Sequence, residues 1–223
     1  MTDVTKTRSR RFMTIAVLGV TGLAAISSAV YVIGGVNGNV LPGSGACQAA
    51  LSAGEAGKAA AAGEVAAFLP AKQPLSVADL SFQDADGTTH KIADFKDKTL
   101  LLNLWATWCA PCRKEMPALD RLQAERGGED FAVLAINVDR GPLDKPKKFL
   151  EDIGTESLKL YADNTMGIFN ELRTRGRAAG LPTTMLIDGK GCEIGSMYGP
   201  AEWASDDAKS LIDAVVKAQD KPA

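Results

Sequence analysis

Two cysteines three positions apart, Cys109 and Cys112, have the types and spacing best suited to chemistry in this sequence. They lie in the run Trp108-Cys109-Ala110-Pro111-Cys112, between an apolar run and a segment with helical spacing. A helix N-terminus carries unpaired amide groups and a partial positive charge, which stabilise a thiolate. The pattern therefore predicts that Cys109 is the attacking sulfur. Cys112, on the same helical face, would then resolve the mixed disulfide that Cys109 forms with a substrate.

Other uses of this cysteine pair are an inert structural disulfide, buried core thiols or a metal site. Zinc would need two further ligands. The single histidine, His90, is expected at the surface, and neither Cys47 nor Cys192 belongs to a second close pair. We therefore expect no metal and no cofactor. A copper-binding or chaperone module that uses Cys109 and Cys112 as ligands remains an alternative from a different class.

The N-terminal region predicts a membrane anchor. Residues 12–36 carry no charge, and as a helix they would be about 37 Å long, enough to cross a bilayer core of about 30 Å. Basic residues precede the segment, so the positive-inside rule places residues 1–11 in the cytoplasm and the rest outside. A cleaved signal peptide ending near Ser27-Ser28-Ala29 and a lipid-modified Cys47 are the alternatives.

Charge argues against a nucleic-acid partner. The chain has a net charge of −2, and its acidic excess lies after the basic N-terminus. Binding to phosphates requires clustered Lys and Arg, which this body lacks.

The rest of the chain divides into a spacer, a domain and a tail. Residues 37–71 are rich in Ala and Gly, which predicts a spacer with some helical tendency that lifts the following domain off the membrane. Residues 72–218 alternate between strand-like and helical patterns, and 219–223 form a short tail. Expected strands are 77–82, 99–105, 131–138, 183–188 and 192–197, and expected helices are 109–126, 145–152, 165–173 and 204–217. This order predicts an α/β domain with a mixed sheet.

The motif region resembles a known family. Residues 103–117 (NLWATWCAPCRKEMP) resemble the thioredoxin superfamily, and more narrowly its membrane-anchored extracytoplasmic branch of TlpA, ResA and the cytochrome c maturation thioredoxins. Three further segments carry the likeness, namely GLPT at 180–183, GCEI at 191–194 and GPAEWA at 199–204. The resemblance implies a thioredoxin-like fold from residue 72 onward.

The resemblance also implies roles for residues around the cysteines. Pro182 matches the family's cis-proline, which faces the active cysteines and shapes the substrate groove. Trp108, Leu181 and Thr183 match positions that line this groove. Trp108 would either cover the nucleophile or pack beside it.

Glu115 matches an acid that the membrane-anchored branch carries three residues after its second cysteine. Thioredoxin instead has a buried acid on the preceding strand, where this chain has Asn103. At this spacing the carboxylate could accept the proton of Cys112 as that thiol attacks. The alternative is an exposed first-turn acid that complements the helix dipole.

The two remaining cysteines, Cys47 and Cys192, are expected to form a structural disulfide. An oxidising compartment makes such a bond plausible, and the resemblance points the same way. It would attach the spacer to the domain. Two unpaired thiols, one of them bonded to another molecule, are the alternative.

By resemblance, the chain is a protein-disulfide reductase on the periplasmic side of the inner membrane. The implied clients are a copper chaperone of the Sco type and the copper-binding (CuA) subunit of cytochrome oxidase, whose thiols must be reduced to hold copper. Apocytochrome c is the alternative client. In either case a transmembrane thiol carrier must supply the electrons.

Overall fold

The computed structural model describes residues 47–219, and a single mixed sheet organises them. Its strand order is β1-β8-β7-β4-β5-β6-β2-β3. At the centre, β4 (Thr99–Trp105) runs parallel to β5 (Phe131–Asn137) and antiparallel to β7 (Thr183–Ile187). Beyond β5, the short β6 (Tyr161–Ala162) continues the parallel part. The thioredoxin-like α/β class with a mixed sheet is therefore confirmed.

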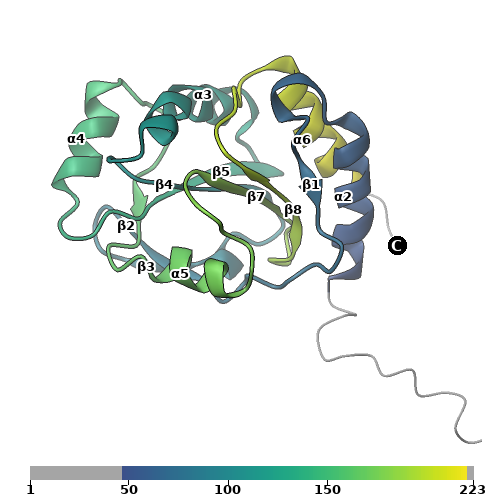
Figure 1. Cartoon of the computed structure of the whole chain (residues 1–223), viewed down its shortest axis with the longest axis horizontal. Helices are drawn as coiled ribbons and strands as arrows, with labels where there is room; N and C mark the ends of the chain where they lie inside the picture. Colours follow the sequence, from purple (N-terminus) through teal and green to yellow (C-terminus); the bar gives the residue numbers. More distant parts are fainter. Residues whose placement is uncertain (1–46, 220–223) are drawn as a thin grey trace, which may run out of the picture. The chain divides into compact units, whose positions relative to one another are not determined.

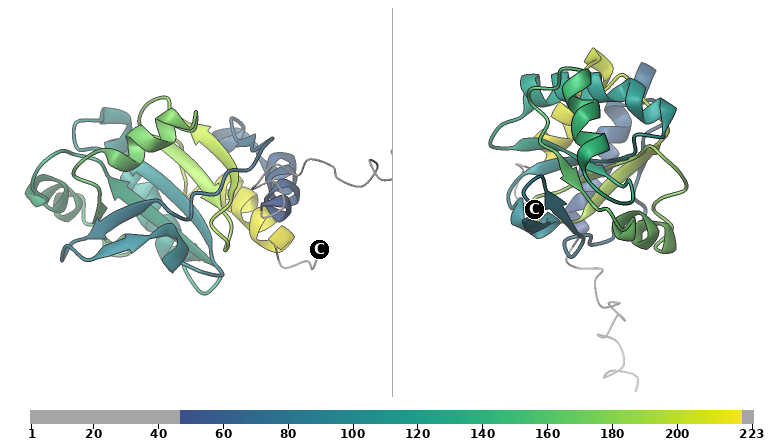
Figure 2. Two further views of the ribbon diagram at one scale, coloured as in Figure 1. Left: turned by 90° about the horizontal axis from the view of Figure 1, so that it is seen from below. Right: turned by 90° about the vertical axis from the view of Figure 1, so that its left-hand side faces the viewer.

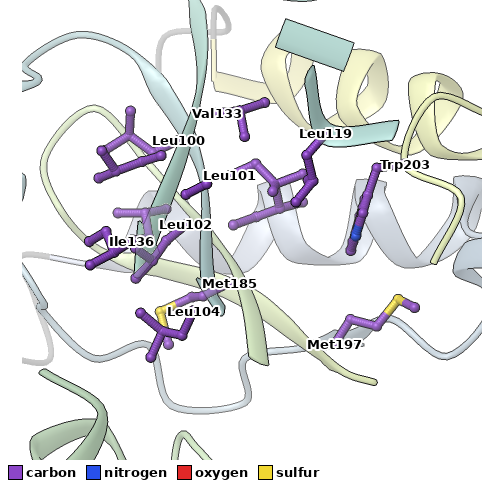
Figure 3. Packing of buried hydrophobic residues seen from close by; sticks show 14 of the residues in the cluster. Leu100, Leu101, Leu102, Leu104, Leu119, Val133, Ile136, Met185, Met197 and Trp203 are labelled. Atoms are coloured by element: carbon purple, nitrogen blue, oxygen red, sulfur yellow. The ribbon is translucent and has the colours of Figure 1, made fainter. Parts of the chain in front are cut away.

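The sequence of β4 explains its central place, because its apolar side chains suit a strand that is buried on both faces of the sheet. Every side chain of its run TLLLNLW is buried. Leu101 points toward Leu119 of the helix that follows, while its neighbours point to the other face of the sheet (Figure 3). That other face includes Leu100, Leu102, Leu104, Ile136 and Met185 (Figure 3).

The helices cover both faces of this sheet (Figures 1 and 2). On one face, α3 (Ala110–Arg126) lies beside α6 (Asp206–Gln219), and α5 (Gly167–Thr174) covers the other. The remaining elements are α4 (Asp144–Asp152), η1 (Gly63–Val65), η2 (Ile92–Asp94), β1 (Leu69–Pro70), β2 (Ser81–Asp84), β3 (Thr89–Lys91) and β8 (Glu193–Tyr198). This arrangement puts the N-terminus of α3 directly after the carboxyl end of the central strand.

Part of the predicted spacer is folded. Within residues 37–71, the structure forms a helix, α2 (Gln48–Ala60), which lies against α6, and then η1 and β1, which pairs with β8. One side of α2 is a buried stripe of small residues at helical spacing: Ala50, Ala53, Gly54 and Gly57. A Cβ on Gly57 would lie 2.8 Å from Val215 of α6. The glycines therefore allow close packing of this helix within the range predicted as a spacer.

Several other boundaries differ from those predicted. The strand expected at 77–82 begins at Ser81, and Ser76 makes only an isolated bridge with Cys192. The short strands β1, β3 and β6 were not predicted, because two or three residues carry no readable alternation. By contrast, the central strand and the helix after it lie where the sequence placed them.

His90, expected as a plain surface residue, is half-buried in the β2–β3 hairpin. Its Nε2 lies 2.9 Å from Oδ2 of Asp84, and its ring stacks on Phe82. Asp84 also accepts hydrogen bonds from the backbone amides of Asp86 and Thr88 in the predicted turn. The histidine thus closes a hairpin and takes no part in the cysteine site.

No helix between residues 47 and 219 is long and apolar enough to cross a membrane. The anchor predicted at 12–36 and the cytoplasmic segment 1–11 lie outside the described residues.

Candidate active site

The redox pair sits at the junction of β4 and α3. Cys109 is the N-cap of α3 and forms a disulfide with Cys112 in the first turn. The backbone N–H of Cys112 donates a hydrogen bond to Sγ of Cys109 at 3.3 Å. After reduction, the same donor and the helix dipole would stabilise a thiolate on Cys109.

The two sulfurs differ in access to solvent. Cys109 is 5% exposed, whereas Cys112 is fully buried. Only Cys109 can therefore meet a disulfide on another protein. Between them, Pro111 occupies the first turn of the helix, where its missing N–H removes a donor that could otherwise reach the thiolate.

Glu115 lies one turn further along α3 and is buried, with 3% of its surface exposed. Its Oε1 accepts a hydrogen bond from Nδ2 of Asn103 at 2.8 Å. Its Oε2 accepts from the backbone N–H of Ala201 and from Nε1 of Trp203, each at 3.2 Å. The reading of Glu115 as an exposed dipole-complementing acid is therefore wrong.

Burial changes the acidity of this carboxyl group. Loss of solvation raises the pKa of Glu115 to about 7, against the opposing effect of the hydrogen bonds from Asn103, Ala201 and Trp203. An open surface pocket is lined by Glu64, Lys114, Glu115, Pro200 and Ala201. Glu115 thus combines an acidity matched to neutral pH with a place in the lining of a pocket that is open to solvent.

Pro182 lies at the same end of the strands as the cysteines. The Leu181-Pro182 bond is cis, and the next residue, Thr183, pairs with Leu104 near the end of the central strand. The backbone N–H of Gly199 donates to the carbonyl oxygen of Pro182 at 3.1 Å, which attaches this turn to β8. The register therefore brings Pro182 level with the strand end from which the loop to Cys109 departs.

The three predicted groove residues differ in exposure. Trp108 is 65% exposed, so it projects from the surface beside the nucleophile and does not pack into the core. Leu181 is half-buried. Thr183 is buried, and its hydroxyl donates to the carbonyl oxygen of Gly180 at 2.6 Å. Its side chain therefore fixes the turn before the cis-proline and does not line a surface.

The second disulfide joins Cys47 to Cys192, with 5.5 Å between their Cα atoms and 145 positions between them in sequence. It ties the start of α2 to the residue before β8, and both sulfurs are buried. All four cysteines are thus disulfide-bonded. In the part of the chain that the structure describes, no group of three or more His, Cys, Asp or Glu side chains could hold a metal ion.

Sequence reasoning missed the residues that surround Glu115. The sequence assigned no role at this site to Trp203, and it marked Asn103 only as the replacement of an acid found in thioredoxin. Both are buried, and both donate to the same carboxylate. The available signal was a polar residue, Asn103, in the middle of an otherwise apolar strand, because a buried polar group requires a partner.

Comparison with known proteins agrees with this geometry. The model of the Redoxin family matches residues 69–212. The chain therefore belongs to the Redoxin family.

Two curated relatives share the site region. The thiol-disulfide oxidoreductase ResA of Geobacillus thermodenitrificans is 33% identical over 113 residues, which is 51% of this chain and 62% of ResA. The thiol:disulfide interchange protein HelX of Rhodobacter capsulatus is 35% identical over 111 residues, which is 48% of this chain and 57% of HelX. The matches thus span less than two thirds of either relative. They confirm the resemblance to the TlpA/ResA branch.

Solved structures show the same fold. A thiol-disulfide oxidoreductase from Bacteroides vulgatus aligns with a TM-score of 0.53 and 29% identity, over 66% of this chain and 96% of the other. A thiol:disulfide interchange protein DsbE from Chlorobium tepidum aligns with a TM-score of 0.54 and 26% identity, over 63% of this chain and 95% of the other.

Proposed function

We propose that this protein is a thiol–disulfide oxidoreductase that reduces disulfides in client proteins. The observation that carries the proposal is the Cys109–Cys112 disulfide at the N-terminus of α3, with the buried acid Glu115 one turn away. The names of ResA and HelX describe the same class of reaction.

The reaction proceeds by two exchanges of sulfur bonds. The thiolate of Cys109 attacks one sulfur of the client disulfide, and the other client sulfur leaves as a thiolate that takes up a proton. Cys112 then attacks Sγ of Cys109, and the second client sulfur leaves in the same way. Two electrons pass to the client, and the protein ends with the Cys109–Cys112 disulfide.

Glu115 is the proton acceptor for the second exchange. Cys112 must lose its proton before it attacks, and Glu115 follows it by three positions on one helical face. The raised pKa, about 7, lets this carboxyl group gain and lose a proton near neutral pH. The pocket beside Lys114 then returns the proton to solvent.

The setting of this chemistry is the periplasmic side of the inner membrane, with residues 12–36 as the anchor. The uncharged run and its basic flank support this placement, and the buried Cys47–Cys192 disulfide suits an oxidising compartment. Because such a compartment reoxidises thiols, a transmembrane thiol carrier must recharge the pair. The resemblance to the TlpA-type motif supports a Sco-type copper chaperone and the CuA subunit of cytochrome oxidase as clients.

Trapping of the client tests this function. In the full-length protein in its own membranes, Cys112→Ser should leave a stalled mixed disulfide on Cys109, because the resolving thiol is gone. The matched control, Cys109→Ser, should trap nothing. Capture of a Sco-type chaperone or the CuA subunit would support the oxidase role, and capture of apocytochrome c would replace it with cytochrome c maturation. Absence of any adduct that depends on Cys109 would overturn the proposed function.

A further inference from the structure

A buried carboxylate outside the residues discussed so far holds the loop that leads to Cys109. Asp139 follows β5 and is 7% exposed. Its Oδ2 accepts a hydrogen bond from the hydroxyl of Thr107 at 2.6 Å. The backbone N–H of Thr107 also faces this carboxylate, at 3.1 Å from Oδ1 and 3.3 Å from Oδ2.

Backbone hydrogen bonds fix the position of Asp139 itself. Its backbone N–H donates to Oδ1 of Asn137 at 3.0 Å, and Asn137 is fully buried at the end of β5. The neighbouring backbone N–H of Val138 donates to the carbonyl oxygen of Trp105 at 2.9 Å. The carboxylate thus has a fixed position relative to the carboxyl end of the central strand.

The loop that Asp139 holds is short and carries the nucleophile. It runs from Ala106 to Trp108, and the backbone N–H of Cys109 donates back to the carbonyl oxygen of Ala106 at 3.1 Å. Thr107 stands only two positions before Cys109. A negative charge fixed at Thr107 therefore lies close to the helix N-terminus, and its effect on a thiolate opposes that of the helix dipole.

We propose that Asp139 is a positioning residue for the redox pair, which orders the Ala106–Trp108 loop and makes the Cys109–Cys112 pair more reducing than a helix N-terminus alone would. The proposal rests on the proposed thiol–disulfide function. A reduced pair carries a thiolate on Cys109, and a nearby anion destabilises that thiolate relative to the uncharged disulfide.

Other ionisable groups around the pair do not duplicate this role. Arg113 lies over the ring of Phe149, 5.2 Å from its centroid, and thus turns toward α4. Lys114 and Arg140 are exposed, so solvent screens their charges. Glu64 lines the same surface pocket as Glu115, and Glu115 is the proton acceptor proposed above.

The test compares Asp139→Asn with the same substitution at a second buried carboxylate, Asp188. Asp188 is 5% exposed and accepts hydrogen bonds from the backbone amides of Lys190 and Cys192, both in the turn after β7. Because β7 is antiparallel to the central strand, this turn lies at the opposite end of the sheet from Cys109. Asp188→Asn therefore removes an equally buried charge far from the redox pair.

Two readouts report on the charge rather than on folding alone. One is the equilibrium constant of the pair with glutathione, and the other is the pKa of Cys109 from thiolate absorbance. Asp139→Asn should lower that pKa by about one unit and shift the equilibrium up to about tenfold toward the reduced protein. Asp188→Asn should leave both as in the wild type. Thr107→Ser, which keeps both donors, should also behave as the wild type.

Three results would overturn the proposal. The first is a folded Asp139→Asn variant in which the pKa of Cys109 and the equilibrium with glutathione equal those of the wild type. The second is a shift of equal size in Asp188→Asn. If Asp139→Asn does not fold, Asp139→Ser is the second neutral variant, since its hydroxyl can still accept from Thr107. Failure of both to fold would show that Asp139 is only structural, which is the third. A wild-type pair that does not exchange with glutathione at all would contradict the proposed function instead.

Discussion

Nδ2 of Asn103 on the central strand lies 2.8 Å from Oε1 of Glu115 on the active-site helix. Asn103 also donates to the hydroxyl oxygen of Thr184 at 2.9 Å, so the strand, its neighbour and the helix are joined at one point. This contact holds a buried carboxyl group one turn from Cys112. The amide restrains Glu115 without adding a second negative charge beside it.

Loss of this carboxyl group should slow resolution of the mixed disulfide. With Glu115→Gln, Cys112 has no buried proton acceptor, and the rate near neutral pH should fall about 100-fold. Stopped-flow measurement of client release between about pH 5.5 and 8.5 checks this, since the wild-type rate should rise through a pKa near 7 and the variant rate should not.

Glu125→Gln is the matched control for that experiment. Glu125 lies at the far end of the same helix, is half-exposed and pairs with Lys209 at 2.6 Å. It should resolve the mixed disulfide at the wild-type rate. Equal rates and equal pH profiles in Glu115→Gln and the wild type would remove the proton-acceptor role.

The same acid should make stability depend on pH. Burial raises the pKa of Glu115 from 4.5 to about 7, so the folded protein binds this proton more tightly than the unfolded chain. The resulting stability is fully present below about pH 4.5 and is lost as the pH rises through about 7, a change of about 3 kcal/mol. Urea unfolding at the two ends of this range should show the loss in the wild type and a smaller one in Glu115→Gln. A decline of the same size in both would contradict the assignment.

The second disulfide should contribute stability but no redox chemistry. A bond across 145 positions stabilises by about 5 kcal/mol in the chain-entropy model. The double change Cys47→Ala with Cys192→Ala should lower the free energy of unfolding by that amount. Denaturant unfolding measures the loss, and the exchange of Cys109–Cys112 with glutathione should be unchanged. A changed exchange equilibrium would show that the two disulfides are coupled.

Substitution of Gly54 in α2 tests whether helix propensity or packing has the larger effect on stability. Alanine is better than glycine in a helix interior by about 1 kcal/mol, so propensity alone predicts that Gly54→Ala stabilises the protein. A Cβ there would lie 2.7 Å from the carbonyl oxygen of Ile194, which the backbone must move to accommodate. We expect a net loss of about 1 to 3 kcal/mol in thermal or denaturant unfolding. The exposed Glu55→Ala on the same helix should be nearly neutral. Stabilisation by Gly54→Ala would show that α2 packs loosely.

Sequence reasoning located the centre of the fold because two signals agreed there. The run 99–105 is apolar except for Thr99 and Asn103, and the cysteine motif follows it directly, so the strand and the start of the helix after it were both placed correctly. Short edge strands such as β6 were missed, since they exist only through their pairing partners.

The sequence predicts a spacer where α2 lies because the buried side of this helix is made of small residues. The segment has few large apolar side chains to mark a core face, and Gly54 and Gly57 interrupt its helical tendency. Only the partner surface on α6 and β8 shows why a side chain cannot be larger there. The hydrogen-bond donors to Glu115 could not be predicted for a related reason. Asn103 and Trp203 are far apart in sequence and come together only in the fold.

The central claim is that Cys109 and Cys112 together pass two electrons to a client disulfide. The most direct measurement mixes the reduced protein with an oxidised client peptide and maps by mass spectrometry which thiols are lost and which are gained. We predict that the protein loses the thiols of Cys109 and Cys112 while the client gains two, and that Cys109→Ser abolishes both changes. Client reduction by Cys109→Ser, or thiols that change only at Cys47 and Cys192, would contradict the account.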